Sequence, residues 1–112
     1  MVSKIETFEK FWPFYLGEHS RGLTRLIHVA GTGVGILLLL LAIITQNWWL
    51  LLAALVSGYG FAWVSHMLVE RNRPATFTYP FWSLIGDLRM FWLFCQGKLE
   101  KEVQRHGISL SD

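Results

Sequence analysis

Two histidines, His28 and His66, lie near the ends of the longest uncharged stretch of this chain. Residues 26–69 contain no Asp, Glu, Lys or Arg, and Gln46-Asn47 marks their centre. Each half, folded as a helix, is long enough to cross the roughly 30 Å hydrocarbon core of a bilayer. His28 lies 19 residues before Asn47 and His66 lies 19 after it. A helical hairpin turning at Asn47 would bring both imidazoles to one depth, which indicates a functional site because ionisable groups in membranes are costly.

Other side chains could join these two histidines at the same membrane face. His19 lies in a polar connection just before the first apolar segment. Glu70 follows His66 by one helical turn and could orient its imidazole. Asp87 shares a helical face with Ser83 that could point toward the histidines. The chain has a single cysteine, so it cannot build a cluster of thiolate ligands. Three imidazoles with carboxylates suit iron, zinc or manganese.

Each candidate also has a structural interpretation. The two histidines could form hydrogen bonds across the helix pair. Glu70 could pair with Arg73, and Asp87 with a neighbouring arginine. The chain contains no nucleophile elbow, P-loop, dinucleotide fingerprint or HExxH motif, so these classes of enzyme have no support.

The composition predicts an all-α membrane protein of one domain. Hydrophobic residues make up 53% of the chain and charged residues 16%, below the roughly 25% of soluble domains. We expect an interfacial N-terminal helix at about 6–17 and a transmembrane hairpin of about 24–45 and 48–70. A third helix at about 80–97 should be interfacial or re-entrant, because Asp87 and Arg89 would be costly in lipid. A polar tail should occupy 98–112.

The cations predict an orientation in the membrane. All ten Lys and Arg residues lie outside 26–69, so the positive-inside rule places both termini in the cytoplasm. A bacterial inner membrane fits this pattern, as would the endoplasmic reticulum in a eukaryote. The cations are too scattered for nucleic-acid binding. Gly31 and Gly35 form a GxxxG spacing that allows close helix contact, within the hairpin or in a homodimer.

Read as blocks, the chain resembles a family of small membrane proteins related to 2-hydroxy fatty acid dioxygenases. The blocks are FYLGEH at 14–19, RLIHVAGT at 25–32, GYGFAWVSH at 58–66 with ERNRPATF at 70–77, and SLIGD at 83–87 with Met90. This resemblance implies an Fe(II)-dependent α-oxidation, in which O₂ shortens a 2-hydroxy fatty acid by one carbon. It also implies that His19, His28 and His66 are the motif histidines, with Glu18, Glu70 and Asp87 as the matching acids, which we take as candidate catalytic residues.

We therefore expect the three histidines to bind Fe(II), with zinc or manganese as alternatives. A 2-hydroxy carboxylate could chelate such a metal through two oxygens, with Arg25 or Arg73 holding the carboxylate. The apolar tail would stay among the helices or in lipid. The competing hypothesis is a lipid-binding or scaffold module without enzymatic activity, in which the histidines are structural.

Overall fold

The regular elements of residues 5–108, the part that the structure, a computed structural model, describes, are all helices, joined by turns and short loops. The all-α prediction is therefore confirmed. The last four residues of the expected polar tail lie outside the described residues. The elements in chain order are α1 (Phe8–Gly17), α2 (Gly22–Thr45), α3 (Trp49–Val64), the π-helical turn η1 (Ser65–Glu70), the 3₁₀ turn η2 (Ala75–Phe77), α4 (Pro80–Cys95) and α5 (Leu99–Arg105).

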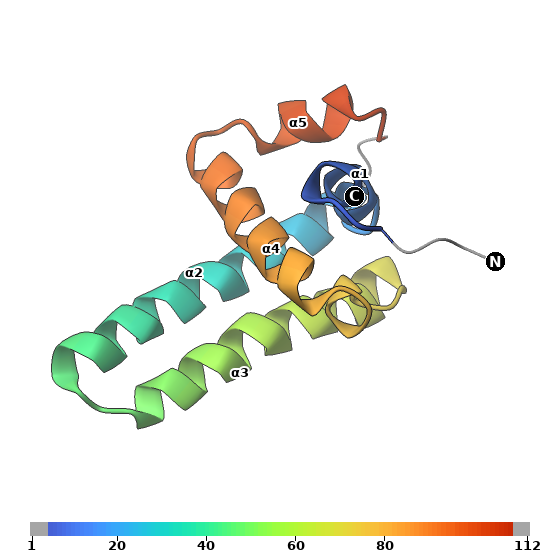
Figure 1. Ribbon diagram of the computed structural model, residues 1–112. Helices are drawn as coiled ribbons and strands as arrows, with labels where there is room; N and C mark the ends of the chain where they lie inside the picture. The colour runs from blue at the N-terminus through green and yellow to red at the C-terminus, as the bar shows by residue number, and fades with distance from the viewer. Residues whose placement is uncertain (1–4, 109–112) are drawn as a thin grey trace.

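Helices α2 and α3 form an antiparallel hairpin, and η1 continues α3 to Glu70 (Figure 1). The hairpin turns where Gln46 adopts a left-handed backbone conformation with φ of 57°. Two glycines of α2 allow the helices to approach closely. A Cβ at Gly31 would collide with the Phe61 side chain, and one at Gly35 would lie 3.3 Å from the Ala54 carbonyl. The GxxxG spacing therefore serves the contact inside the hairpin.

The hairpin exposes apolar surface along most of its length. Both Gly22–Thr45 and Trp49–Glu70 are long and apolar enough to cross a membrane, yet only 22% of the most apolar window of each is buried. The core helix of a water-soluble protein would be mostly buried. Ile44 and Trp49 near the turn are 76% and 78% exposed. Apolar surface this extensive needs a lipid or protein cover, which supports association with a membrane.

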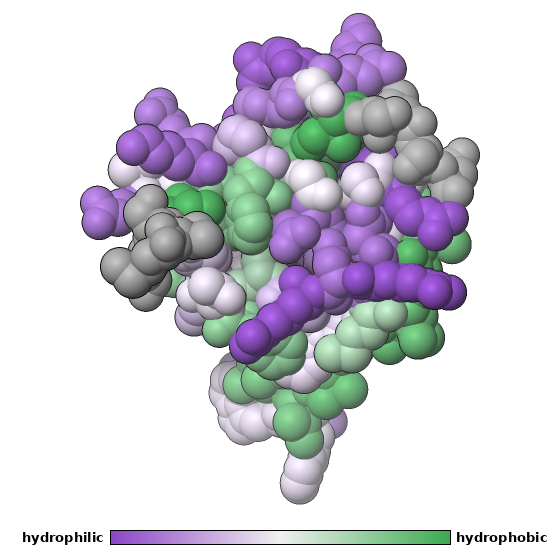
Figure 2. Space-filling model, turned by 90° about the vertical axis from the view of Figure 1, so that its right-hand side faces the viewer, coloured by the Kyte–Doolittle hydropathy of each residue, from purple (hydrophilic) through white to green (hydrophobic). Residues whose placement is uncertain are grey.

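The remaining helices gather at the end of the hairpin opposite the turn (Figure 1). There α4 packs across α2 and also contacts α1 and α5. In Figure 2 hydrophilic residues occupy the upper part of the face shown, and green and pale residues occupy the lower part. We call α1, α4 and α5 the cap and the α2–α3 hairpin the stem; on the face shown, the cap is mostly polar and the stem mostly apolar.

The aromatic face of α1 is buried inside this cap. Phe11, Trp12, Tyr15 and Leu16 are each at most 3% exposed, and they form one core with residues of α2, α4 and α5. This aromatic stripe was expected to lie in the membrane interface, but in the structure it packs against protein. Its helical spacing is equally suited to either environment.

The segment expected to be a polar tail contains α5. Leu99 and Val103, spaced by one helical turn, are at most 3% exposed and belong to the core. The Glu102 carboxylate accepts a hydrogen bond of 2.7 Å from Trp12 Nε1 and pairs with Arg105 at 2.9 Å. Burial alone would raise the pKa of Glu102. The hydrogen bond from Trp12 and the positive charge of Arg105 outweigh this effect, so the pKa of Glu102 lies below its usual value.

We expect Gly31→Ala to destabilise the hairpin. A methyl group gains helix propensity but must displace the Phe61 side chain, and overpacking of this kind costs about 1–3 kcal/mol. Gly60→Ala is the matched control, because a Cβ there meets nothing within 4 Å. Thermal unfolding in detergent should show a lower midpoint for the first variant only. Equal midpoints would contradict this packing.

We also expect the docking of α5 to weaken in acid. Because the folded-state pKa of Glu102 is lowered, its carboxylate stabilises the fold above about pH 4.3 and loses this effect as the pH falls through the folded value. The unfolding midpoint of the wild type should exceed that of Glu102→Gln at pH 7, and the two should converge at about pH 3. A gap that persists in acid would show that the charge is not responsible.

Candidate metal centre

Three buried histidines meet where the cap joins the hairpin. His19 lies in the α1–α2 connection, His28 on α2 and His66 on η1, and each is at most 2% exposed. One possible ligand atom from each lies within 4.8 Å of the others. The ring centroids of His28 and His66 are 5.9 Å apart. The prediction that these two imidazoles lie close together is thus confirmed. The ring centroid of His19 lies 4.7 Å from that of His28 and 4.3 Å from that of His66.

The hydrogen-bond partner of His19 determines which of its nitrogens is free. Its Nδ1 lies 2.8 Å from the Tyr15 carbonyl oxygen, which can only accept a hydrogen bond. We infer that Nδ1 carries the proton and that Nε2 presents a lone pair. Burial lowers the pKa of His19 well below its usual value, and His28 and His66 add to this effect. The ring is therefore neutral.

The side chain of Asn72 determines which ring nitrogen of His66 carries the proton. Its amide nitrogen donates to the Glu18 carbonyl and carboxylate at 3.0 Å, which assigns its Oδ1 as the acceptor. That oxygen lies 2.7 Å from His66 Nδ1. His66 therefore also carries its proton on Nδ1 and leaves Nε2 free.

The two free nitrogens point at each other. His19 Nε2 and His66 Nε2 are 2.9 Å apart, a hydrogen-bond distance, although the partners of both rings assign the proton to the opposite nitrogen. Two lone pairs facing one another in a buried site repel. A cation between them removes this repulsion, and 2.9 Å is about the separation of two neighbouring imidazole ligands that each lie about 2.1 Å from one ion.

His28 completes the donor set. Its Nε2 lies 3.2 Å from Asp87 Oδ1, which also accepts a hydrogen bond of 2.6 Å from the Tyr15 hydroxyl. Among the described residues its Nδ1 is buried and has no hydrogen-bond partner. A ligand histidine commonly has one ring nitrogen oriented by a carboxylate, carbonyl or amide. Each of the three imidazoles has such a partner, so the residues present fit a metal ion.

Tyr15 and Asp87 are coupled through their short hydrogen bond. Burial raises the pKa of Asp87 to about 7, and the bond from Tyr15 acts in the opposite direction. Burial also raises the pKa of Tyr15 well above its usual value, and the Asp87 charge adds to that rise. The phenol therefore keeps its proton and acts as a donor that orients the carboxylate toward His28.

Glu70 does not orient His66, contrary to the expectation from their spacing. Its carboxylate accepts hydrogen bonds from the backbone N–H groups of Ser20 and Arg21 at 3.0 and 3.1 Å. It also accepts the hydroxyl hydrogens of Ser20 and Thr24. Arg21 caps α2 without a side-chain bond, so this carboxylate satisfies the open N-terminus of α2 and complements its dipole. The described ion pairs include none between Arg73 and Glu70, and Arg89, near Asp87 in sequence, pairs instead with Glu102.

The other predicted residues surround the site. The Glu18 carboxylate accepts a hydrogen bond from Asn72. Burial raises the pKa of Glu18; the hydrogen bond from Asn72 opposes this rise, and the negative charge of Glu70 adds to it. Arg25, 2% exposed, donates to the carbonyl oxygens of His19 and Ser20 and pairs with Glu100 at 2.9 Å. Arg73 is exposed and lies 5.2 Å from the Phe77 ring centroid. Arg25 therefore holds the connection that carries His19.

Sequence reasoning did not assign roles to Tyr15 and Asn72. Asn72 reaches back to His66 because η1 is π-helical and Arg71 then turns the chain with φ of 62°. Its backbone N–H donates to the His66 carbonyl at 2.9 Å. The π-helical turn is common at functional sites but has no reliable sequence signature. Tyr15 lies in the aromatic stripe of α1, one helical turn before His19. Its hydroxyl, a hydrogen-bond donor in an otherwise apolar stripe, is the feature of the sequence that could have indicated its role.

Comparison with known proteins identifies the family of this chain. A family model described as 2-hydroxy-palmitic acid dioxygenase Mpo1-like matches residues 5–99. The match covers most of the chain and includes all three histidines and their partners. The chain therefore belongs to this family. No curated protein and no solved structure was found to match it.

We expect Asn72→Ala to weaken metal binding more than it weakens the fold. Loss of the partner frees the His66 ring to take the wrong tautomer, and such losses typically cost 10–100-fold in metal affinity. Asn47→Ala, in the distant hairpin turn, is the matched control. Anaerobic equilibrium dialysis with Fe(II), repeated with Zn(II), measures the change. Unaltered affinity in the first variant would remove the orienting role of Asn72.

Proposed function

We propose that this protein binds Fe(II) through His19, His28 and His66 and oxidises 2-hydroxy fatty acids with O₂. The overall change is R–CH(OH)–COOH + O₂ → R–COOH + CO₂ + H₂O. The C1–C2 bond breaks, and its two carbons lose the four electrons that dioxygen gains. The observation that supports the proposal is the set of three buried, oriented imidazoles in a member of a family named for this activity.

The choice of metal rests on the donor set and on the chemistry required. Neutral imidazoles suit iron and zinc, and three protein ligands leave further positions open. When bound, Fe(II) supplies redox chemistry with O₂, whereas Zn(II) is not redox-active. Manganese remains an alternative to be tested by metal analysis. The residues of this chain supply the rest of the site.

Their roles follow from the contacts. The Tyr15 carbonyl and the Asn72 amide hold His19 and His66 with their free nitrogens facing each other. The Asp87 carboxyl, itself held by the Tyr15 hydroxyl, orients His28. Arg25 ties the His19 connection to α2 and α5. Glu18, Glu70 and Asp87 are thus positioning residues in this proposal, and binding of a substrate carboxylate by Arg73 stays a prediction.

The position of the site suits a lipid substrate. The histidines lie at the cap end of the hairpin, and we place this end at the cytoplasmic face because all cations of the chain lie outside residues 26–69. A fatty acid in the same leaflet has its carboxylate at that depth and its chain toward the bilayer centre. The head of the substrate would reach the histidines without leaving the membrane.

The test is turnover by purified protein reconstituted with Fe(II) in detergent or nanodiscs. With 2-hydroxyhexadecanoate, the wild type should consume one O₂ for each pentadecanoate formed. His66→Ala should lower turnover more than about 100-fold while helix content is retained. His106→Ala is the matched control, because His106 lies beside Glu102 and outside the cluster.

Two other outcomes would contradict the proposal. Activity of a zinc form without O₂ would indicate a hydrolase. No turnover with any metal, together with a lower unfolding midpoint and no metal loss in His66→Ala, would indicate a structural role for the histidines in a lipid-binding or scaffold module.

A further inference from the structure

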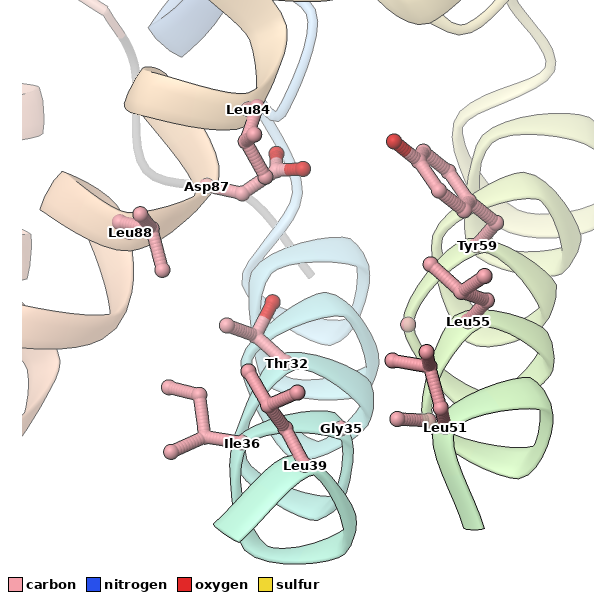
Figure 3. A pocket seen from close by; sticks show the side chains of 12 residues that line it. Thr32, Gly35, Ile36, Leu39, Leu51, Leu55, Tyr59, Leu84, Asp87 and Leu88 are labelled. Carbon is pink, nitrogen blue, oxygen red and sulfur yellow. The ribbon is translucent and has the colours of Figure 1, made fainter. Parts of the chain in front are cut away.

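A cavity of about 250 Å³ lies between α2, α3 and α4 (Figure 3), and one of its lining residues, Asp87, contacts His28. Twelve residues line it, and all but Thr32, Tyr59 and Asp87 are Leu, Ile, Ala or Gly. The Thr32 hydroxyl donates to the His28 carbonyl at 3.1 Å, so it is already satisfied. The cavity is thus apolar except at one end.

The polar end of the cavity adjoins the metal centre. Asp87 lines the cavity, and its Oδ1 is the atom 3.2 Å from His28 Nε2. Thr32 follows His28 by one helical turn. Figure 3 shows Thr32, Tyr59 and Asp87 toward one end and Leu39 and Leu51 toward the other, nearer the hairpin turn. From Thr32 to Leu39 the cavity follows α2 for about 10 Å.

We propose that this cavity holds the acyl chain of the substrate, with the 2-hydroxy carboxylate at the histidines and the methyl end toward Leu39 and Leu51. This inference rests on the proposed function and extends it to a binding site. An α-helix, about 10 Å across with its side chains, is too large for a cavity of this volume, whereas a single methylene chain is slender enough. The direction also matches that of lipid chains beside the hairpin.

Two glycines keep the cavity open between its ends. Gly35 on α2 and Gly58 on α3 both line it, and they lie opposite each other, since a Cβ on Gly35 would be 3.7 Å from the Gly58 backbone nitrogen. A Cβ on Gly58 itself meets nothing within 4 Å. A larger side chain at Gly58 therefore fills space that the acyl chain would use, without colliding with the backbone.

The inference makes Gly58 a determinant of chain-length specificity. Gly58→Leu should lower kcat/KM for 2-hydroxyhexadecanoate by about tenfold or more, because several methylenes lose their apolar contacts. Activity on 2-hydroxyoctanoate should change by less than about twofold, and bound iron should not change. Gly60→Leu is the matched control, because Gly60 has the same open surroundings on the same helix but does not line the cavity.

A binding measurement tests the same site without turnover. A 2-hydroxy fatty acid of sixteen carbons with a diazirine near its methyl end should label wild-type peptides between Ile36 and Leu55. Gly58→Leu should lose this labelling, and Gly60→Leu should keep it. Labelling that a simple diacyl lipid displaces as well as unlabelled substrate does would show a general lipid groove and overturn the assignment.

The outcomes separate the two proposals. If the wild type turns over no 2-hydroxy acid of any length, the proposed function fails. If it turns over long chains and Gly58→Leu keeps the wild-type chain-length profile, the cavity assignment alone fails. If Gly58→Leu does not fold, the labelling pattern of the wild type still decides, since labels outside 36–55 would refute the site.

Discussion

The proposed centre depends on two buried imidazole nitrogens 2.9 Å apart, in rings whose other hydrogen-bond partners assign both protons to the opposite nitrogens. The Tyr15 carbonyl and the Asn72 side-chain oxygen impose this arrangement by accepting hydrogen bonds from the Nδ1–H groups of His19 and His66. Protonation of either imidazole is disfavoured by burial, so the repulsion is best relieved by a bound cation. The third imidazole, His28, belongs to the same cluster and has a buried nitrogen, Nδ1, without a hydrogen-bond partner among the described residues. A purely structural cluster would be expected to pair these nitrogens with donors.

The architecture keeps this arrangement in place from several directions. The close hairpin contact at Gly31 sets α2 against α3 and brings His28 to the level of His66. The Glu70 carboxylate joins the end of the hairpin to the start of α2 through three hydrogen-bonding residues. The cap helices then cover the histidines from the other side. Each of the three histidines thus lies on a segment held by neighbouring helices or hydrogen bonds, as the proposed metal centre requires.

Features that follow from helical periodicity, such as the depth of each histidine along the hairpin, were predictable from the sequence. Features that depend on local backbone geometry were not. Equal spacing from Asn47 correctly predicted that His28 and His66 are neighbours, because helical rise per residue is constant. Spacing also suggested Glu70 as the partner of His66, but the π-helical end of the hairpin gives that role to Asn72. The polar composition of the tail concealed α5, although the i, i+4 spacing of Leu99 and Val103 was a usable signal. Metal binding itself remains a prediction.

Iron K-edge X-ray absorption of the purified, Fe(II)-loaded protein tests the central claim most directly. The account predicts a shell of imidazole nitrogens about 2.1 Å from the metal, with scattering from three rings in the wild type and from two in His66→Ala. His106→Ala should reproduce the wild-type spectrum. A spectrum typical of hydrated iron, or one unchanged by loss of His66, would contradict the proposed centre.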